Sequence, residues 1–95
     1  SLTNGADCSG FVMSVFANFG YSLPRVAAAQ CDASTKKDIN QIEPGDLVFY
    51  GSGAIDHVAL YIGDGKIIHA SGAATGIKIS NYDYEQPTAI GTFME

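Results

Sequence analysis

A cysteine at the start of a helix-like stretch is the residue of this chain best placed to do chemistry. The apolar residues after Cys8 recur at helical spacing and predict an amphipathic helix from about Cys8 to Phe19, with Gly20 placed to end it and Asn4 or Asp7 able to cap its start. In a first helical turn, unpaired backbone N–H groups and the positive end of the dipole favour negative charge. A thiol there loses its proton more easily, and the thiolate is the nucleophilic form. Cys8 is therefore a candidate nucleophile.

The two histidines of the chain flank a predicted β-hairpin. His57 precedes and His69 follows the turn residues 63–65, Gly-Asp-Gly. Because side chains alternate between the faces of a strand, a two-residue turn would place the imidazoles on opposite faces. A three-residue loop pairs Ile62 with Lys66 and places both on one face. The last glycine of the loop suits the left-handed residue that this loop needs, so we predict the three-residue loop and neighbouring imidazoles.

Together these three side chains could form the catalytic group of a cysteine hydrolase. His57 would take the proton of Cys8 as general base and return it to the leaving amine. His69 would fix the tautomer and orientation of His57, as an Asp or Asn does in other triads. Backbone N–H groups at the helix start could stabilise the oxyanion. Ala59 shares the predicted histidine face, and its small side chain leaves room for the helix to pack there.

The rest of the sequence predicts a scaffold of one small domain, residues 1–95. A short second helix is expected at 26–31, followed by an irregular polar stretch at 32–40 and a turn at 43–46. Tyr21, Tyr82 and Tyr84 could line a groove or merely cover the sheet. A helix followed by an antiparallel meander makes an α+β fold. Strands are predicted at 47–50, 57–62, 66–70, 76–80 and 89–93.

Composition excludes several classes of function. The chain has 95 residues, 46% of them hydrophobic, and a net charge of −5 with only five Lys and Arg. This excess of acidic over basic residues argues against binding to a nucleic acid, because phosphate binding needs clustered basic residues. No apolar run approaches the roughly 18–20 residues of a membrane span. The first four residues show neither the basic start nor the hydrophobic stretch of a signal peptide, so we expect a piece of something longer.

Five short motifs follow one another along the chain: Asp7-Cys8-Ser9-Gly10, Leu23-Pro24-Arg25, Pro44-Gly45-Asp46-Leu47-Val48-Phe49, His57-Val58-Ala59-Leu60-Tyr61-Ile62-Gly63 and Ile68-His69-Ala70. In content and order, over about residues 5–80, they resemble the motifs of the NlpC/P60 family of cell-wall cysteine peptidases. The resemblance implies a reduced papain-like fold, with the cysteine-bearing helix packed on a central antiparallel sheet. It assigns Cys8, His57 and His69 to the catalytic triad, and Asp7 and Ser9 to positions that in some members contact the free amine of the stem peptide.

The same resemblance implies a reaction, a substrate and a location. The reaction is hydrolysis of peptidoglycan stem peptides, usually between γ-D-glutamate and the diamino acid, without a cofactor, by a protein secreted by a bacterium to its cell wall. Members normally carry a further segment before the cysteine, with a helix and a tyrosine that lines the substrate site. Only seven residues precede Cys8 here, so we expect a domain shortened at its N-terminus and part of a longer multidomain protein.

Other functions remain possible on the same residues. The fold could serve as a non-catalytic module that only binds cell-wall peptide, although the intact Cys8, His57 and His69 favour catalysis. An amidase or acyltransferase would differ in the product released. With Cys31, the three residues also make the Cys₂His₂ set that a structural zinc needs. Neither pair lies close enough in sequence to form a chelating knuckle, which disfavours zinc and leaves Cys31 a structural or incidental role.

Overall fold

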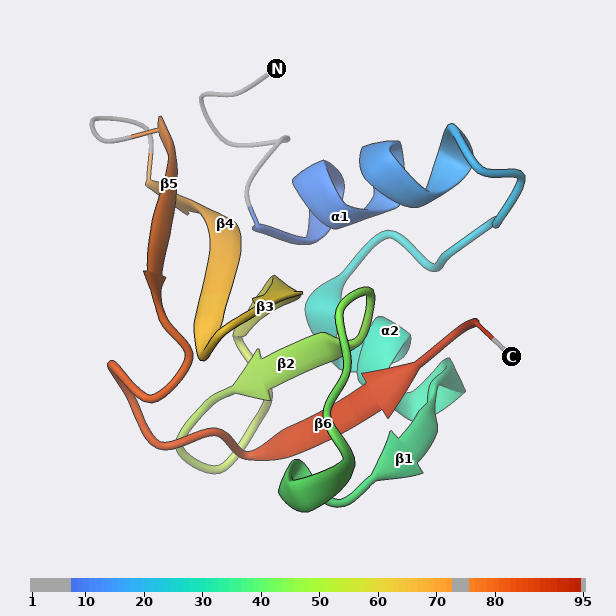
Figure 1. The fold of residues 1–95 in the computed structure, drawn as a ribbon. Helices are drawn as coiled ribbons and strands as arrows, with labels where there is room; N and C mark the ends of the chain where they lie inside the picture. Colours follow the sequence, from blue (N-terminus) through green and yellow to red (C-terminus); the bar gives the residue numbers. More distant parts are fainter. Residues whose placement is uncertain (1–7, 73–75, 95) are drawn as a thin grey trace.

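The computed structural model describes residues 8–72 and 76–94, with residues 71 and 72 described by their backbone alone (Figure 1). It confirms the α+β class, with two helices and a six-stranded sheet. In the described residues, no helix is long and apolar enough to cross a membrane. The elements are α1 (Cys8–Ala17), α2 (Ala27–Ala33), β1 (Thr35–Lys37), the 3-10 helix η1 (Ile39–Gln41), β2 (Leu47–Tyr50), β3 (His57–Gly63), β4 (Lys66–Gly72), β5 (Gly76–Asn81) and β6 (Ala89–Thr92).

The strands form one antiparallel sheet in the order β1-β6-β2-β3-β4-β5. The predicted meander is confirmed for β2 to β5 but wrong for the last strand. β6 pairs with β2 on one side and with β1 on the other, as Figure 1 shows. β1 itself lies in the stretch predicted to be irregular. Its three residues find their backbone partners in β6, so only tertiary pairing makes them a strand.

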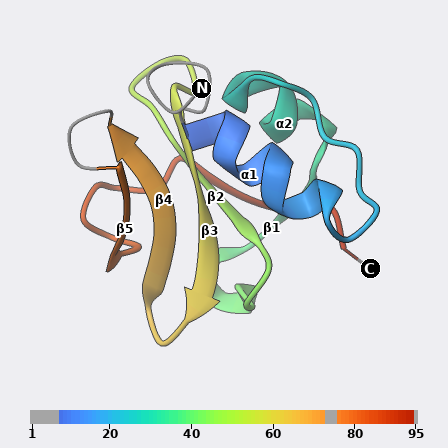
Figure 2. The same cartoon turned by 90° about the horizontal axis from the view of Figure 1, so that it is seen from above.

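Alternate residues of the strands divide the core into two parts. Both helices lie on one side of the sheet (Figure 2). The helix side of the core contains Val12 and Phe16 of α1 together with Phe49 and Val58 of the sheet, all at most 3% exposed. Fully burying an apolar side chain of this size stabilises the fold by roughly 1.5–3 kcal/mol. The opposite face is packed by Val48, Tyr50, Ala59, Tyr61, Ile67 and Ile90.

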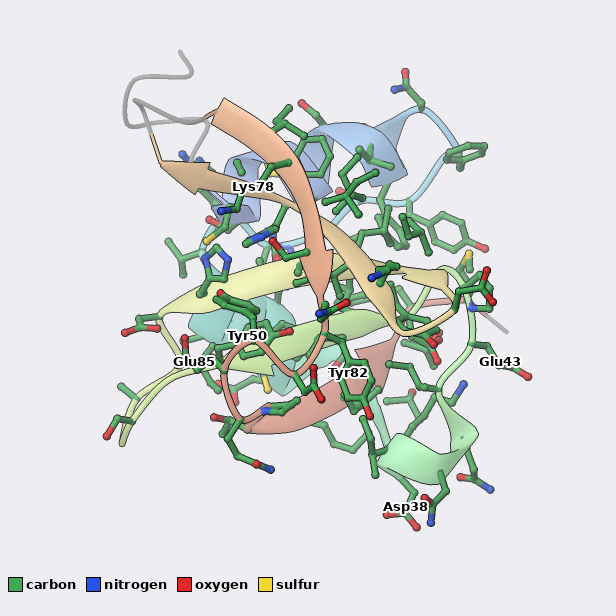
Figure 3. All side chains as sticks on the ribbon, turned by 60° about the vertical axis from the view of Figure 1, so that its left-hand side comes forward. Asp38, Glu43, Tyr50, Lys78, Tyr82 and Glu85 are labelled. Carbon is green, nitrogen blue, oxygen red and sulfur yellow. The ribbon has the colours of Figure 1, made fainter. Side chains whose placement is uncertain are left out.

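The segment between β5 and β6 covers that opposite face. Tyr50 and Tyr82 (Figure 3) are joined by a hydrogen bond, in which the fully buried Tyr50 donates its hydroxyl to the carbonyl of Tyr82 at 2.6 Å. The Tyr82 ring packs edge-on against Tyr61. Burial raises the pKa of Tyr50 well above its ordinary value. Tyr84 follows and packs against Tyr50, with ring centroids 5.2 Å apart. Of the three tyrosines that the sequence left open, Tyr82 and Tyr84 therefore cover the sheet, and Tyr82 also lines a pocket with Pro87 and Ala89. Tyr84 stays half-exposed, and Tyr21 packs on the helix side, edge-on against Phe16.

The β3–β4 hairpin differs from its prediction in the turn but not in the outcome. Gly63 pairs with Lys66, so the turn has two residues, and both have positive φ angles (57° for Asp64 and 74° for Gly65), which is the type I′ geometry that Asp-Gly favours. The predicted three-residue loop is wrong. However, the pairing between β3 and β4 shifts by one residue at Ile62, which has no partner in β4 and is an extra residue in β3. This bulge displaces the alternation by one position and returns the rest of β3 to the predicted register.

Candidate active site

Cys8 is the first residue of α1, and the segment around α2 holds this end of the helix in place. Cys8 is 8% exposed. The fully buried Gln30 donates its side-chain amide to the backbone carbonyls of Ser9, at 3.1 Å, and of Pro24, at 2.8 Å. The guanidinium of Arg25 donates to the hydroxyl of Ser9 at 3.0 Å. The turn that carries the candidate nucleophile is thus tied to the second helix by side chains distant in sequence.

The two imidazoles are in direct contact, which confirms that they are neighbours. Nε2 of His57 lies 2.7 Å from Nδ1 of His69, and the rings meet edge-to-face with centroids 5.0 Å apart. On the far side, Nε2 of His69 lies 3.1 Å from the hydroxyl of Ser80 on β5. His69 is 1% exposed and His57 is partly buried. Because His57 uses Nε2 toward His69, the nitrogen with which it can take up a proton from a thiol is Nδ1.

Both imidazoles are neutral at pH 7. Burial lowers the pKa of His57 below its ordinary value, against the opposing pull of the carboxylates of Glu85 and Asp56. Burial, together with the positive charges of His57 and Lys78, lowers the pKa of His69 to about 4. A neutral imidazole is the form that can accept a proton, so His57 is in the state that a general base requires.

Tyr84 packs against the histidine pair and is within electrostatic range of the cysteine. Its ring packs against His69, with centroids 5.4 Å apart. Burial raises the pKa of Tyr84, and so do the negative charges of Glu85, Cys8 and Asp56. The Cys8 thiolate therefore lies close enough to act on a tyrosine that itself touches His69. Sequence reasoning missed this role, because nothing in the local pattern around Tyr84 indicates that its ring packs against His69.

The helix packs on the face opposite to the one predicted. Val58 lies in the helix-side core, whereas Ala59 packs with Tyr50, Tyr61 and Ile67 on the other face. The expectation that Ala59 makes room for the helix is wrong, because α1 buries its apolar stripe against the strand residues that alternate with the histidines. Cys8, the first residue of α1, is itself part of this helix-side core, and its charge acts on Tyr84 from there.

The remaining candidates have different outcomes. Asp7 lies outside the described residues. Ser9 is 4% exposed and engaged with Arg25 and Gln30, so its contact with substrate stays a prediction. Cys31 is buried in the helix-side core, where burial raises the pKa of its thiol, and it is not joined to Cys8 in a disulfide. In residues 8–72 and 76–94, no three His, Cys, Asp or Glu side chains are grouped so as to hold a metal ion.

Comparison with known proteins gives the family. The model of the NlpC/P60 family matches residues 1–92. The chain is 49% identical over 77 residues to the probable endopeptidase p60 of Listeria innocua, covering 79% of this chain and 16% of that protein. It is 43% identical over 79 residues to the γ-D-glutamyl-L-lysine dipeptidyl-peptidase of Bacillus subtilis, covering 79% and 27%. The chain thus spans less than a third of these curated relatives.

A solved structure agrees with these sequence matches. The peptidoglycan hydrolase RipB of Mycobacterium tuberculosis superposes with a TM-score of 0.86 at 36% identity, covering 94% of this chain and 45% of that one. The similarity therefore extends over almost all of the chain, in sequence and in three dimensions. The chain belongs to the NlpC/P60 family, and its two helices on a six-stranded antiparallel sheet are the papain-like fold of that family.

Proposed function

We propose that this chain is the catalytic domain of a cysteine endopeptidase that hydrolyses peptidoglycan stem peptides at the γ-D-glutamyl–diamino acid bond. The single observation that carries the proposal is the 2.7 Å contact between Nε2 of His57 and Nδ1 of His69. Two neutral imidazoles in this relation make a general base with a fixed orientation. The names of the Listeria and Bacillus relatives support the reaction, and the Bacillus name supports the bond.

The mechanism follows from the roles of the three side chains. The thiol of Cys8 gives its proton to Nδ1 of His57, and the thiolate attacks the carbonyl carbon of the scissile bond. The imidazolium that forms donates its Nε2–H to Nδ1 of His69, which stabilises the charge. N–H groups in the first turn of α1 receive the developing oxyanion. His57 then protonates the leaving amine, and water activated by His57 releases the acyl group from sulfur.

The substrate and the location follow from the same proposal. Asp7 and Ser9, next to the nucleophile in sequence, would contact the free amine of the stem peptide. The thiol and the two imidazoles supply nucleophile, base and orientation, so the reaction needs no cofactor. A protein that cuts stem peptides acts at the cell wall, and we propose that this domain belongs to a longer protein secreted there by a bacterium. Its described strands and helices would then serve as the peptidase unit.

Mass spectrometry of muropeptides incubated with the chain tests this function. We expect new fragments cut after γ-D-glutamate with the wild type and none with Cys8→Ala. Cys31→Ala is the matched control, because Cys31 is buried to the same degree, 7% against 8% exposed, in the same helix-side core. It should lose a similar amount of stability and keep the cleavage. Cleavage that survives in Cys8→Ala would refute the mechanism. Binding of muropeptides without cleavage by the wild type would favour the non-catalytic module.

A further inference from the structure

Ser80 on β5 makes a contact at the active site that the catalytic scheme does not use. It stands opposite Ile67 in the β4–β5 register, and so lies on the same face of the sheet as His69, two positions along β4. Its hydroxyl is 3.1 Å from Nε2 of His69. The scheme above requires only Nδ1 of that imidazole. The second nitrogen of His69 therefore has a partner whose purpose is still to be explained.

The proton count of the two imidazoles gives that purpose. A neutral imidazole has one N–H donor and one acceptor nitrogen. When His57 holds the proton of the thiol, both of its nitrogens are donors, and Nδ1 of His69 has to accept. The single proton of His69 must then be on Nε2, where it points at the hydroxyl of Ser80. In the opposite tautomer, Nδ1–H of His69 would donate to Nε2 of His57 and leave the His57 proton on Nδ1, where the thiol proton has to go.

Burial makes the Nε2–H tautomer depend on this one hydroxyl, which accepts the Nε2–H in that tautomer and would donate to Nε2 in the opposite one. His69 is 1% exposed, so an N–H without a partner there would lose its bond to water without replacement. The other groups that face the ring are His57 from β3, Lys78 from β5 and Tyr84 from the following segment. A lysine ammonium can only donate hydrogen bonds. Tyr84 contacts the imidazole through its ring, at a centroid distance of 5.4 Å.

We propose that Ser80 is a positioning residue that holds His69 in its Nε2–H tautomer and so keeps Nδ1 of His57 open to the proton of Cys8. The row of side chains would then run from Cys8 through His57 and His69 to Ser80. The effect of Ser80 on the rate rests on the proposed function. The tautomer of His69 does not, because it is a property of the folded chain.

Nitrogen NMR of the ¹⁵N-labelled chain near pH 7 tests the tautomer directly, because protonated and unprotonated imidazole nitrogens have distinct chemical shifts. In the wild type we expect His69 to be protonated at Nε2. Ser80→Ala should shift the ring to a mixture of tautomers or to Nδ1–H, and Ser80→Thr, which keeps the hydroxyl on a strand-compatible side chain, should restore Nε2–H. A wild-type ring protonated at Nδ1, or an unchanged tautomer in Ser80→Ala, would overturn the proposal.

Kinetics on muropeptides give the second readout. Ser80→Ala should lower kcat about tenfold with little change in KM, as expected for one lost hydrogen bond that supports the transition state. Ser80→Thr should keep most of the rate, and Ser14→Ala, an exposed serine on α1, should keep all of it. In a His69→Asn background, Ser80→Ala should change kcat no further, because Asn has no atom near the position of Nε2.

The two readouts separate the two proposals. If the wild type does not cleave at all, the proposed function fails, while NMR still decides the role of Ser80. If the wild type cleaves and Ser80→Ala cleaves equally well, the positioning role is refuted and the peptidase stands. If Ser80→Ala lowers both kcat and thermal stability, and Ser80→Thr restores neither, Ser80 only supports the fold. That outcome also refutes the proposal.

Discussion

Acid should destabilise this domain through His69, because the folded protein binds a proton there much less well than the unfolded chain does. Burial, with the positive charges of His57 and Lys78, lowers the pKa of His69 from 6.5 to about 4. The unfolded chain has the ordinary value and takes up the proton first as the pH falls. The contribution of the neutral imidazole to stability is therefore complete above pH 6.5 and is lost progressively between 6.5 and 4.

The size of the effect follows from these two pKa values. On lowering the pH from 7 to 4.5, a single group with pKa 6.5 unfolded and about 4 folded costs about 2 kcal/mol of unfolding free energy. Domains of this length have a total of about 5–14 kcal/mol. Burial also lowers the pKa of His57, so its contribution has the same sign. The loss through His69 alone is thus a substantial part of the stability.

Urea denaturation of the wild type and of His69→Asn between pH 7 and pH 4.5 measures this contribution. Asparagine does not titrate and keeps an acceptor near the position of Nδ1. The variant should be less stable at pH 7, because it loses packing against Tyr84. Its further loss on acidification should nevertheless be smaller than that of the wild type by about 2 kcal/mol. Carboxylates titrate in both proteins and cancel in the comparison. Parallel curves for the two proteins would refute a depressed His69 pKa.

Two further substitutions test the supports of the site. Gln30→Ala should lower the unfolding free energy by about 2–4 kcal/mol, because it removes a buried side chain that donates to two carbonyls. The control Gln41→Ala, at an exposed position, should change it by less than about 0.5 kcal/mol. Equal losses of the two variants in denaturant unfolding would contradict the anchoring role of Gln30. Tyr84→Ala should raise the pKa of His69 in an NMR titration by exposing the ring to water, whereas Tyr84→Phe should leave it near 4. An unchanged pKa in Tyr84→Ala would show that this ring does not shield His69.

Local signals in the sequence were sufficient for α1 and its end. Apolar spacing predicted the helix, and Gly20 ends it as expected, with a φ of 86° and the Tyr21 N–H bonded to the Phe16 carbonyl in the manner of a Schellman motif. The prediction extended the helix to Phe19, which instead lies beyond α1 and is 75% exposed. The regular helix closes at Ala17, so the following residues leave the stripe.

Tertiary pairing decided what the local signals could not. The insertion of β6 between β1 and β2 depends on partners at least 40 positions apart, such as Phe49 and Ala89 in one pairing and Lys37 and Ile90 in the other. No pattern within either segment specifies that partner. The same holds for Ser80 and Tyr84, which reach His69 only after β5 has returned along β4. The contact between His57 and His69, in contrast, was predicted from strand alternation, because both residues lie in one hairpin.

The hairpin shows that the contact between the imidazoles depends on the number of unpaired residues between them, odd or even, and not on the type of turn. His57 and His69 share a face only if one residue between them is left out of the pairing. The prediction put that residue in a three-residue loop, whereas Asp64 and Gly65 take the tighter turn and the unpaired residue is Ile62, 42% exposed in the bulge of β3. Either solution gives the same register beyond it. Deleting one strand residue while keeping the turn would separate the two imidazoles, since the alternation would then carry them to opposite faces.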